Sequence, residues 1–111
     1  MDISFRTRRL ERTFNSEREL NRAYGGRTAR TIMMRLAVLK NARVLSLVPT
    51  SRPDRLHQLI GNRRGQFAVD LAHPYRLIFV PNHDPVPLRE DGGIDRDRVN
   101  AITIIEVVDY H

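Results

Sequence analysis

The pattern of apolar and polar positions changes its period part-way along the chain. In the first half, apolar residues recur three and four positions apart, as they do on one face of a helix. From Arg55 onward the period shortens to two, which is typical of strands with one buried face. The pattern therefore predicts helices first and a run of strands after them.

The amino-terminal part is expected to hold a short strand at residues 3–5 and then helical sequence. Leu10 and Phe14 lie four positions apart, as on one helix face. The segment Ser16-Glu17-Arg18-Glu19 has the form of a capping box, in which the Ser16 hydroxyl accepts from the Glu19 amide. A helix is predicted to begin there and to end at Gly25-Gly26, because glycine readily adopts the left-handed conformation that closes helices.

A second helix is predicted over residues 28–44. Its apolar stripe consists of Ala29, Ile32, Met33, Leu36 and Leu39. Its basic residues, Arg30, Arg35, Lys40 and Arg43, fall mostly off that stripe. The two methionines are interpreted as core residues.

Strands are predicted at 56–59, 66–71, 75–80 and 101–110. A glycine-bounded turn at 61–65 joins the first two, and an acidic, proline-containing excursion at 81–100, with Asp91-Gly92-Gly93 at its tip, precedes the last. The last strand is rich in β-branched residues and is expected to be central and buried. We predict one α+β domain over residues 1–111, with two amino-terminal helices packed on one face of a mainly antiparallel sheet of about four to five strands.

Composition excludes several classes of protein. The hydrophobic fraction is 41%, and no apolar run approaches the roughly 20 residues of a membrane helix. Without cysteine there is neither a disulfide nor a thiolate zinc site, and residues 1–14 lack the pattern of a secretory signal, so a cytoplasmic location is expected. The net charge of +6 is uneven, with a balance of +10 over residues 1–80 and −4 over 81–111. Such an arginine-rich surface suits nucleic acid or an acidic protein.

Two segments carry candidate chemistry. The chain ends on VVDYH, where strand alternation puts Asp109 and His111 on one side and Tyr110 on the other. A carboxylate beside an imidazole holds its tautomer and favours its charged form. The segment LHQLIGNRRGQF adds His57 on a strand and Arg63-Arg64 in the turn.

Together these groups match the requirements of RNA cleavage without a metal. A base removes the proton of a 2′-hydroxyl, an acid protonates the leaving 5′-oxygen, and fixed cations stabilise the pentavalent phosphorane. Imidazoles, a carboxylate, a phenol and the guanidiniums of Arg63, Arg64 and Arg76 supply these parts. This hypothesis requires that the carboxyl end lie beside the turn at 61–65.

The sequences LHQLIGNRRGQFAVD, HPYRLIF and VVDYH resemble the HigB-type toxins of the RelE/ParE superfamily. The resemblance covers residues 56–80 and 101–111, whereas residues 1–55 agree only in the order of their elements. It implies a ribosome-dependent mRNA endonuclease without a cofactor, neutralised by a HigA-like helix-turn-helix antitoxin. The residues that match the functional positions of the family are His57, Arg63, Arg76, Asp109, Tyr110 and His111. In this hypothesis Asp109 or His111 is the base, His57 or His111 is the acid, Tyr110 orients the nucleotide, and Arg63, Arg64 and Arg76 bind phosphate.

The chain departs from that family at two places. Ile60 stands where these toxins commonly have lysine, and the excursion at 81–100 is longer than their usual hairpin. Three alternatives stay open. One is a ParE-like inhibitor of DNA gyrase without nuclease activity, and another is an inactive module that binds RNA or the ribosome. The third is a metal centre of His57, Asp109 and His111, which the surrounding arginines disfavour.

Overall fold

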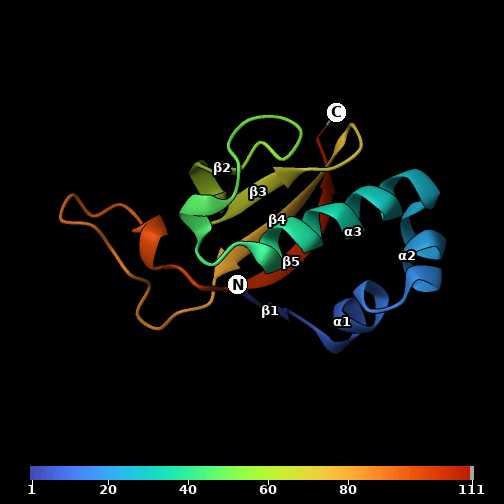
Figure 1. The fold of residues 1–111 in the computed structure, drawn as a ribbon, viewed down its shortest axis with the longest axis horizontal. Coiled ribbons are helices and arrows are strands. Elements are labelled where there is room, and N and C mark those ends of the chain that lie inside the picture. The colour runs from blue at the N-terminus through green and yellow to red at the C-terminus, as the bar shows by residue number, and fades with distance from the viewer. Residues whose placement is uncertain (111) are drawn as a thin grey trace.

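The structure is a computed structural model in which residues 1–110 are described. A strand comes first, followed by helices, and the rest of the sheet forms from the second half of the chain (Figure 1). The elements are β1 (Asp2–Phe5), α1 (Arg8–Phe14), α2 (Glu17–Tyr24), α3 (Gly26–Asn41), β2 (His57–Gln58), β3 (Phe67–Asp70), β4 (Tyr75–Pro81) and β5 (Ala101–Asp109). Short 3₁₀ turns lie at 45–47, 61–63 and 96–98.

Local capping explains where the helices begin and end. The Ser16 hydroxyl accepts from the Glu19 amide at 3.2 Å, which confirms the predicted start of α2. Gly25, with φ of 82°, ends α2 and precedes α3 directly. The prediction of two helices was wrong, because Thr7 caps a separate α1 by accepting from the Leu10 amide at 3.1 Å. The described chain therefore holds three α-helices, and α3 runs from Gly26 to Asn41 rather than over 28–44.

The five strands of the described chain form one mixed sheet in the order β1-β5-β4-β3-β2. The pairs β5-β4, β4-β3 and β3-β2 are antiparallel, as predicted. The parallel pairing of β1 with β5, in which Ile3 lies opposite Ile102, was not predicted. It places β5 in the interior of the sheet, which confirms that the last strand is central.

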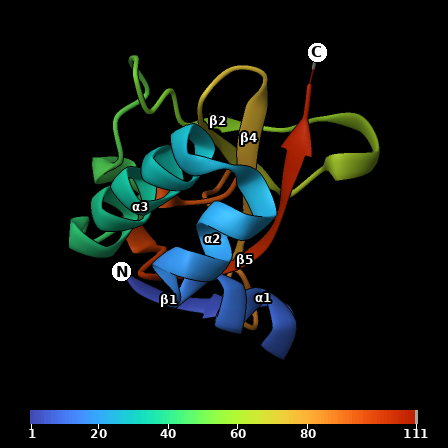
Figure 2. The same ribbon diagram turned by 90° about the vertical axis from the view of Figure 1, so that its right-hand side faces the viewer.

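The main core lies between the helices and one face of the sheet (Figure 2). It joins Leu20 of α2 and Ile32 and Leu39 of α3 to sheet residues such as Phe79 and Ile104, and all five are at most 1% exposed. Burial of this apolar surface is the main force that fixes the helices on the sheet.

Arg35 of α3 lies off the predicted apolar stripe, yet it is buried, with only 6% of its surface exposed. Its Nε donates to the Asp70 carbonyl oxygen at 2.6 Å, and its Nη2 donates to the Pro53 carbonyl oxygen at 3.3 Å. Its Nε also lies 3.7 Å from Asp54 Oδ1. These acceptors come from the loop before β2 and from β3, so helical periodicity alone contains no information about them.

The acidic excursion extends from the end of the sheet opposite to the carboxyl end of β5 (Figure 1). It bends back on itself where Leu88 bridges Ile94, and the Asp91-Gly92-Gly93 tip is as predicted. Its return path is anchored by Val99, which is fully buried and whose carbonyl oxygen accepts from the Leu45 amide at 2.9 Å. Among residues 1–110, no helix has the length and apolar character needed to cross a membrane.

Candidate functional site

The sheet face that points away from the helices carries most of the candidate residues. Leu77 and Phe79 belong to the main core, so their neighbours Arg76 and Ile78 point to the opposite face. The strand register aligns His57, Ala68, Ile78 and Glu106 in one row across this face. The row beside it contains Asp70, Arg76 and Val108.

This second face is not fully open. Ala68 and Ile78 are both 0% exposed although they lie outside the main core. The segment that includes Gly61–Arg63 lies on the side of the sheet away from α3 (Figure 2) and covers part of this face. The polar residues therefore surround a small apolar patch instead of lining a flat sheet.

His57 is held in one orientation by the backbone before it. Its Nδ1 lies 2.8 Å from the Arg55 carbonyl oxygen, and because a carbonyl only accepts, Nδ1 carries the hydrogen. In the neutral ring this leaves the lone pair on Nε2. In the imidazolium form, the proton held by the carbonyl stays on Nδ1, and the proton on Nε2 is the one available for transfer.

Asp70 holds two arginines on the same face. Its carboxylate accepts from Arg55 Nε at 2.7 Å and from Arg55 Nη2 at 3.0 Å, which is a bidentate pair. This hydrogen bond raises the pKa of the Arg55 guanidinium. Arg76 Nε lies 3.5 Å from Asp70 Oδ1, and the Arg76 guanidinium carbon lies 4.3 Å from the centre of the Tyr110 ring. One carboxylate thus connects the backbone that holds His57 to the Arg76–Tyr110 stack.

The turn at 61–65 reaches the last strand through Arg63. Its Nη2 lies 3.4 Å from Glu106 Oε2, and its Nη1 donates to Gln66 Oε1 at 2.7 Å. A guanidinium has five N–H donors, so Arg63 keeps donors for a further anion. Arg64 is exposed, and Ile60, which is 87% exposed, lines the same shallow hollow as Arg64.

The carboxyl end of the described chain follows β5, whereas His57 lies on β2, and the two strands are not neighbours in the sheet. Tyr110 extends the pairing with β4, since its amide donates to the Pro74 carbonyl oxygen at 3.0 Å, and its side chain shares the face of Arg76. Asp109 pairs with Tyr75, which packs against the main core, so strand alternation directs Asp109 to the helix side of the sheet. His57 is three strands away from β5, a backbone separation of about 14 Å. His111, the other predicted catalytic residue at this end, lies outside the described residues.

No role was predicted for Asp70 or Arg55, although Asp70 contacts Arg76 and the Arg55 carbonyl accepts from His57. Asp70 and Arg76 lie opposite each other in adjacent strands, so the strand pattern contained a signal for that contact. The strand pattern did not indicate the Arg55–Asp70 contact, because Arg55 precedes β2 and has an unusual φ of 47°.

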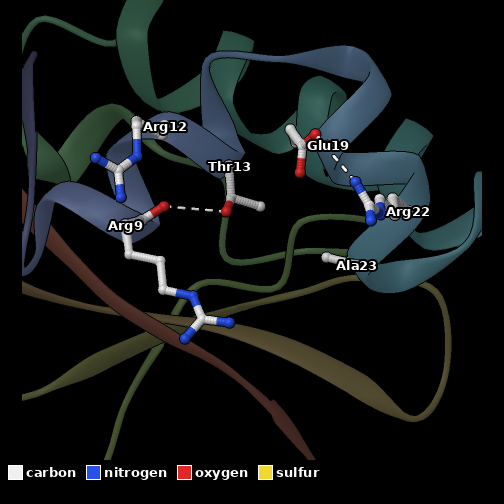
Figure 3. A pocket seen from close by; sticks show the side chains of 6 residues that line it. All are labelled: Arg9, Arg12, Thr13, Glu19, Arg22 and Ala23. Carbon is white, nitrogen blue, oxygen red and sulfur yellow. Dashed lines mark hydrogen bonds and ion pairs between the residues drawn. The ribbon is translucent and has the colours of Figure 1, made fainter.

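A second basic surface lies between α1 and α2, remote in sequence from the sheet face. A hollow of about 620 Å³ is lined by Arg9, Arg12 and Thr13 of α1 and by Glu19, Arg22 and Ala23 of α2 (Figure 3). Within it, Glu19 and Arg22 are 3.8 Å apart, and both side chains are largely exposed. The hollow therefore presents three guanidiniums and one carboxylate.

Comparison of the chain with known protein families, with curated proteins and with solved structures gives no match. Over residues 1–110, no group of three or more His, Asp or Glu side chains is arranged to hold a metal ion.

Proposed function

We propose that this protein is the toxin of a type II toxin-antitoxin system, of the HigB kind within the RelE/ParE superfamily, and that it cleaves mRNA on the ribosome. The observation that carries the proposal is the gathering of an imidazole, a phenol and paired guanidiniums on one sheet face. His57, Arg63, Arg76 and Tyr110, which come from separate parts of the sequence, share that face. The family resemblance and the α+β fold, with helices on one face of the sheet, also support the proposal.

In the proposed reaction, a base at the carboxyl end removes the proton of the 2′-hydroxyl. Of the two predicted candidates, Asp109 lies on the helix side of the sheet, opposite the face of His57, so the role is proposed for His111. The 2′-oxygen attacks the adjacent phosphorus, the bond from phosphorus to the 5′-oxygen breaks, and His57 Nε2 protonates that oxygen. The products are a 2′,3′-cyclic phosphate and a free 5′-hydroxyl. The hydrogen bond from His57 Nδ1 supports the acid role, since it leaves only the Nε2 proton for transfer.

Charge stabilisation in this mechanism comes from arginines that are already oriented. Arg63 and Arg76 are each held by a carboxylate, so little reorganisation is needed when negative charge develops on the phosphate. Arg64 contributes a further cation from the exposed end of the turn. Tyr110, stacked on Arg76, offers a ring face and a hydroxyl for orienting a nucleotide.

The basic hollow between α1 and α2 supports docking on ribosomal RNA. Its three arginines lie on α1 and α2 and not on the sheet, so one surface can hold the ribosome while the other meets mRNA. A cytoplasmic location and a helix-turn-helix antitoxin partner belong to the same proposal.

The test is cleavage of a defined mRNA in a purified translation system, with the new 5′ ends mapped by primer extension. We expect His57→Ala to lower the cleavage rate by about 10²–10⁴-fold, the usual contribution of a general acid. His83→Ala is the matched control, because His83 lies in the excursion, where its Nε2 accepts from the Asn100 amide.

Two results would contradict the proposal. One is wild-type protein that leaves mRNA on translating ribosomes intact, and the other is His57→Ala protein that cleaves at the wild-type rate. Intact mRNA together with inhibition of purified DNA gyrase would instead favour the ParE-like alternative. Binding to ribosomes without cleavage would indicate the inactive module.

A further inference from the structure

We infer that Asp70 is a positioning residue that acts through Arg55 to determine which nitrogen of His57 carries the transferable proton. The inference rests on the proposed nuclease function and adds to it a residue that neither the family resemblance nor the sequence pattern assigned. It is supported by a series of contacts that leads from the core to the imidazole.

The first step in this series of contacts is the fixed position of Asp70 itself. Its amide donates to the Asp54 carbonyl oxygen at 2.8 Å, and its own carbonyl oxygen accepts from the buried Arg35 at 2.6 Å. Both backbone groups of Asp70 are therefore bonded to parts of the protein outside the sheet. This anchors the residue more firmly than strand pairing alone.

The second step is the set of hydrogen bonds that holds Arg55 in one conformation. Arg55 adopts a left-handed φ of 47°, a conformation that is costly for a residue with a side chain. The bidentate contact with Asp70 and the bond from the Arg55 amide to the Ser51 carbonyl oxygen, at 2.8 Å, hold it there. This conformation of Arg55 fixes the direction of its carbonyl group.

The third step is the bond from that carbonyl to His57 Nδ1, at 2.8 Å. A free neutral imidazole prefers to carry its hydrogen on Nε2, so the Arg55 carbonyl reverses the intrinsic preference. Both carboxylate oxygens of Asp70 accept from Arg55, so its role is assigned through that residue. It acts by keeping the acceptor of the His57 proton in place.

The experiment measures the tautomer directly by two-bond ¹H–¹⁵N correlation spectra of the histidine rings, at about pH 8.5, where an ordinary imidazole is neutral. In the wild-type protein we expect His57 to carry its hydrogen on Nδ1. In Asp70→Asn, which has the same shape but no charge, we expect the population to shift toward the Nε2–H form. Arg55→Lys, which cannot make the bidentate contact, is expected to give the same shift. Asp97→Asn, at an exposed position on the 3₁₀ turn at 96–98, is the matched control and should leave His57 unchanged.

Cleavage is measured on the same variants, and we expect Asp70→Asn to lower the rate about 10- to 100-fold, since misplacement of a reacting group by about 1 Å costs this much. Backbone amide spectra report whether each variant is folded. An unchanged His57 tautomer in folded Asp70→Asn would overturn the inference, whatever happens to the rate. Wild-type protein with the Nδ1–H tautomer but without cleavage would refute the nuclease proposal alone, because the tautomer is measured without substrate.

Discussion

Replacement of Arg35 by methionine is expected to be among the most destabilising single changes in this protein. The guanidinium and the Asp54 carboxylate are both about nine-tenths buried, with side-chain exposures of 7% and 10%. Methionine keeps the length of the aliphatic part of the side chain and removes the charge and all of its donors. The Asp54 carboxylate, whose Oδ1 is buried without a hydrogen bond, would then lack its cation as well.

The size of the effect follows from these contacts. Two unit charges 3.7 Å apart attract each other by about 4.5 kcal/mol at an effective dielectric constant of ~20. Part of this attraction offsets the cost of burying the charges, but removal of one partner leaves that cost uncompensated. The carbonyl groups of Asp70 and Pro53 also lose their donor. We therefore expect a loss of about 3–5 kcal/mol, a large share of the roughly 5–15 kcal/mol that stabilises a typical domain.

The measurement is urea unfolding at neutral pH, followed by circular dichroism. Arg30→Met is the matched control, because Arg30 lies on α3 but is exposed, and its effect should stay below about 0.5 kcal/mol. The double variant Arg35→Met/Asp54→Leu should be more stable than Arg35→Met by at least about 1 kcal/mol, since no unpaired charge remains. If the free energy of unfolding of Arg35→Met lies within about 1 kcal/mol of the wild-type value, and its slope against urea concentration is unchanged, this account of the buried pair is refuted.

Two further predictions concern the charged surfaces. If the hollow between α1 and α2 docks on RNA, replacement of Arg9, Arg12 and Arg22 together by alanine should reduce the salt dependence of ribosome binding. The slope of log K against log[salt], measured by filter binding at several salt concentrations, should become shallower by about 2, as expected for the loss of three phosphate contacts. At the tip of the excursion, the Gly93 amide donates to the Asp91 carboxylate at 2.8 Å, and this bond, with Arg89 nearby, lowers the pKa of the Asp91 carboxyl. The ionised carboxylate therefore stabilises the turn at neutral pH, and this contribution disappears as the pH falls through the lowered pKa. The Gly93 amide chemical shift should report that titration below the ordinary range of aspartate, and Asp91→Asn should abolish it.

Periodicity and turn chemistry determined most of the secondary structure. The capping residue Ser16, the glycines after Tyr24 and the alternation along β3 and β4 act over a few neighbouring residues, so their effects can be predicted without the fold. The same local rules missed that α1 is a separate helix. They also missed the parallel pairing of β1 with β5, which joins residues about a hundred positions apart and depends on how the helices cross the sheet.

The candidate residues themselves could be named from the sequence, since residue type and turn context indicated His57, Arg63, Arg76 and Tyr110. Of their partners, Asp70 was indicated only by its place opposite Arg76 in the adjacent strand, and Arg55 was not indicated at all. The bidentate contact of Arg55 with Asp70 and the burial of Arg35 depend on the path of a loop and on an unusual backbone conformation.

What the sequence by itself determined is therefore the order of the elements and the chemical groups at hand, because both follow from interactions between near neighbours. What only the tertiary structure decided is the arrangement of those groups around one carboxylate. The Asp70 carboxylate meets Arg55, from the loop before β2, and Arg76, from the adjacent strand β4. The contact with Arg55 depends on the path of the loop before β2, which is set by long-range packing and not by any local pattern.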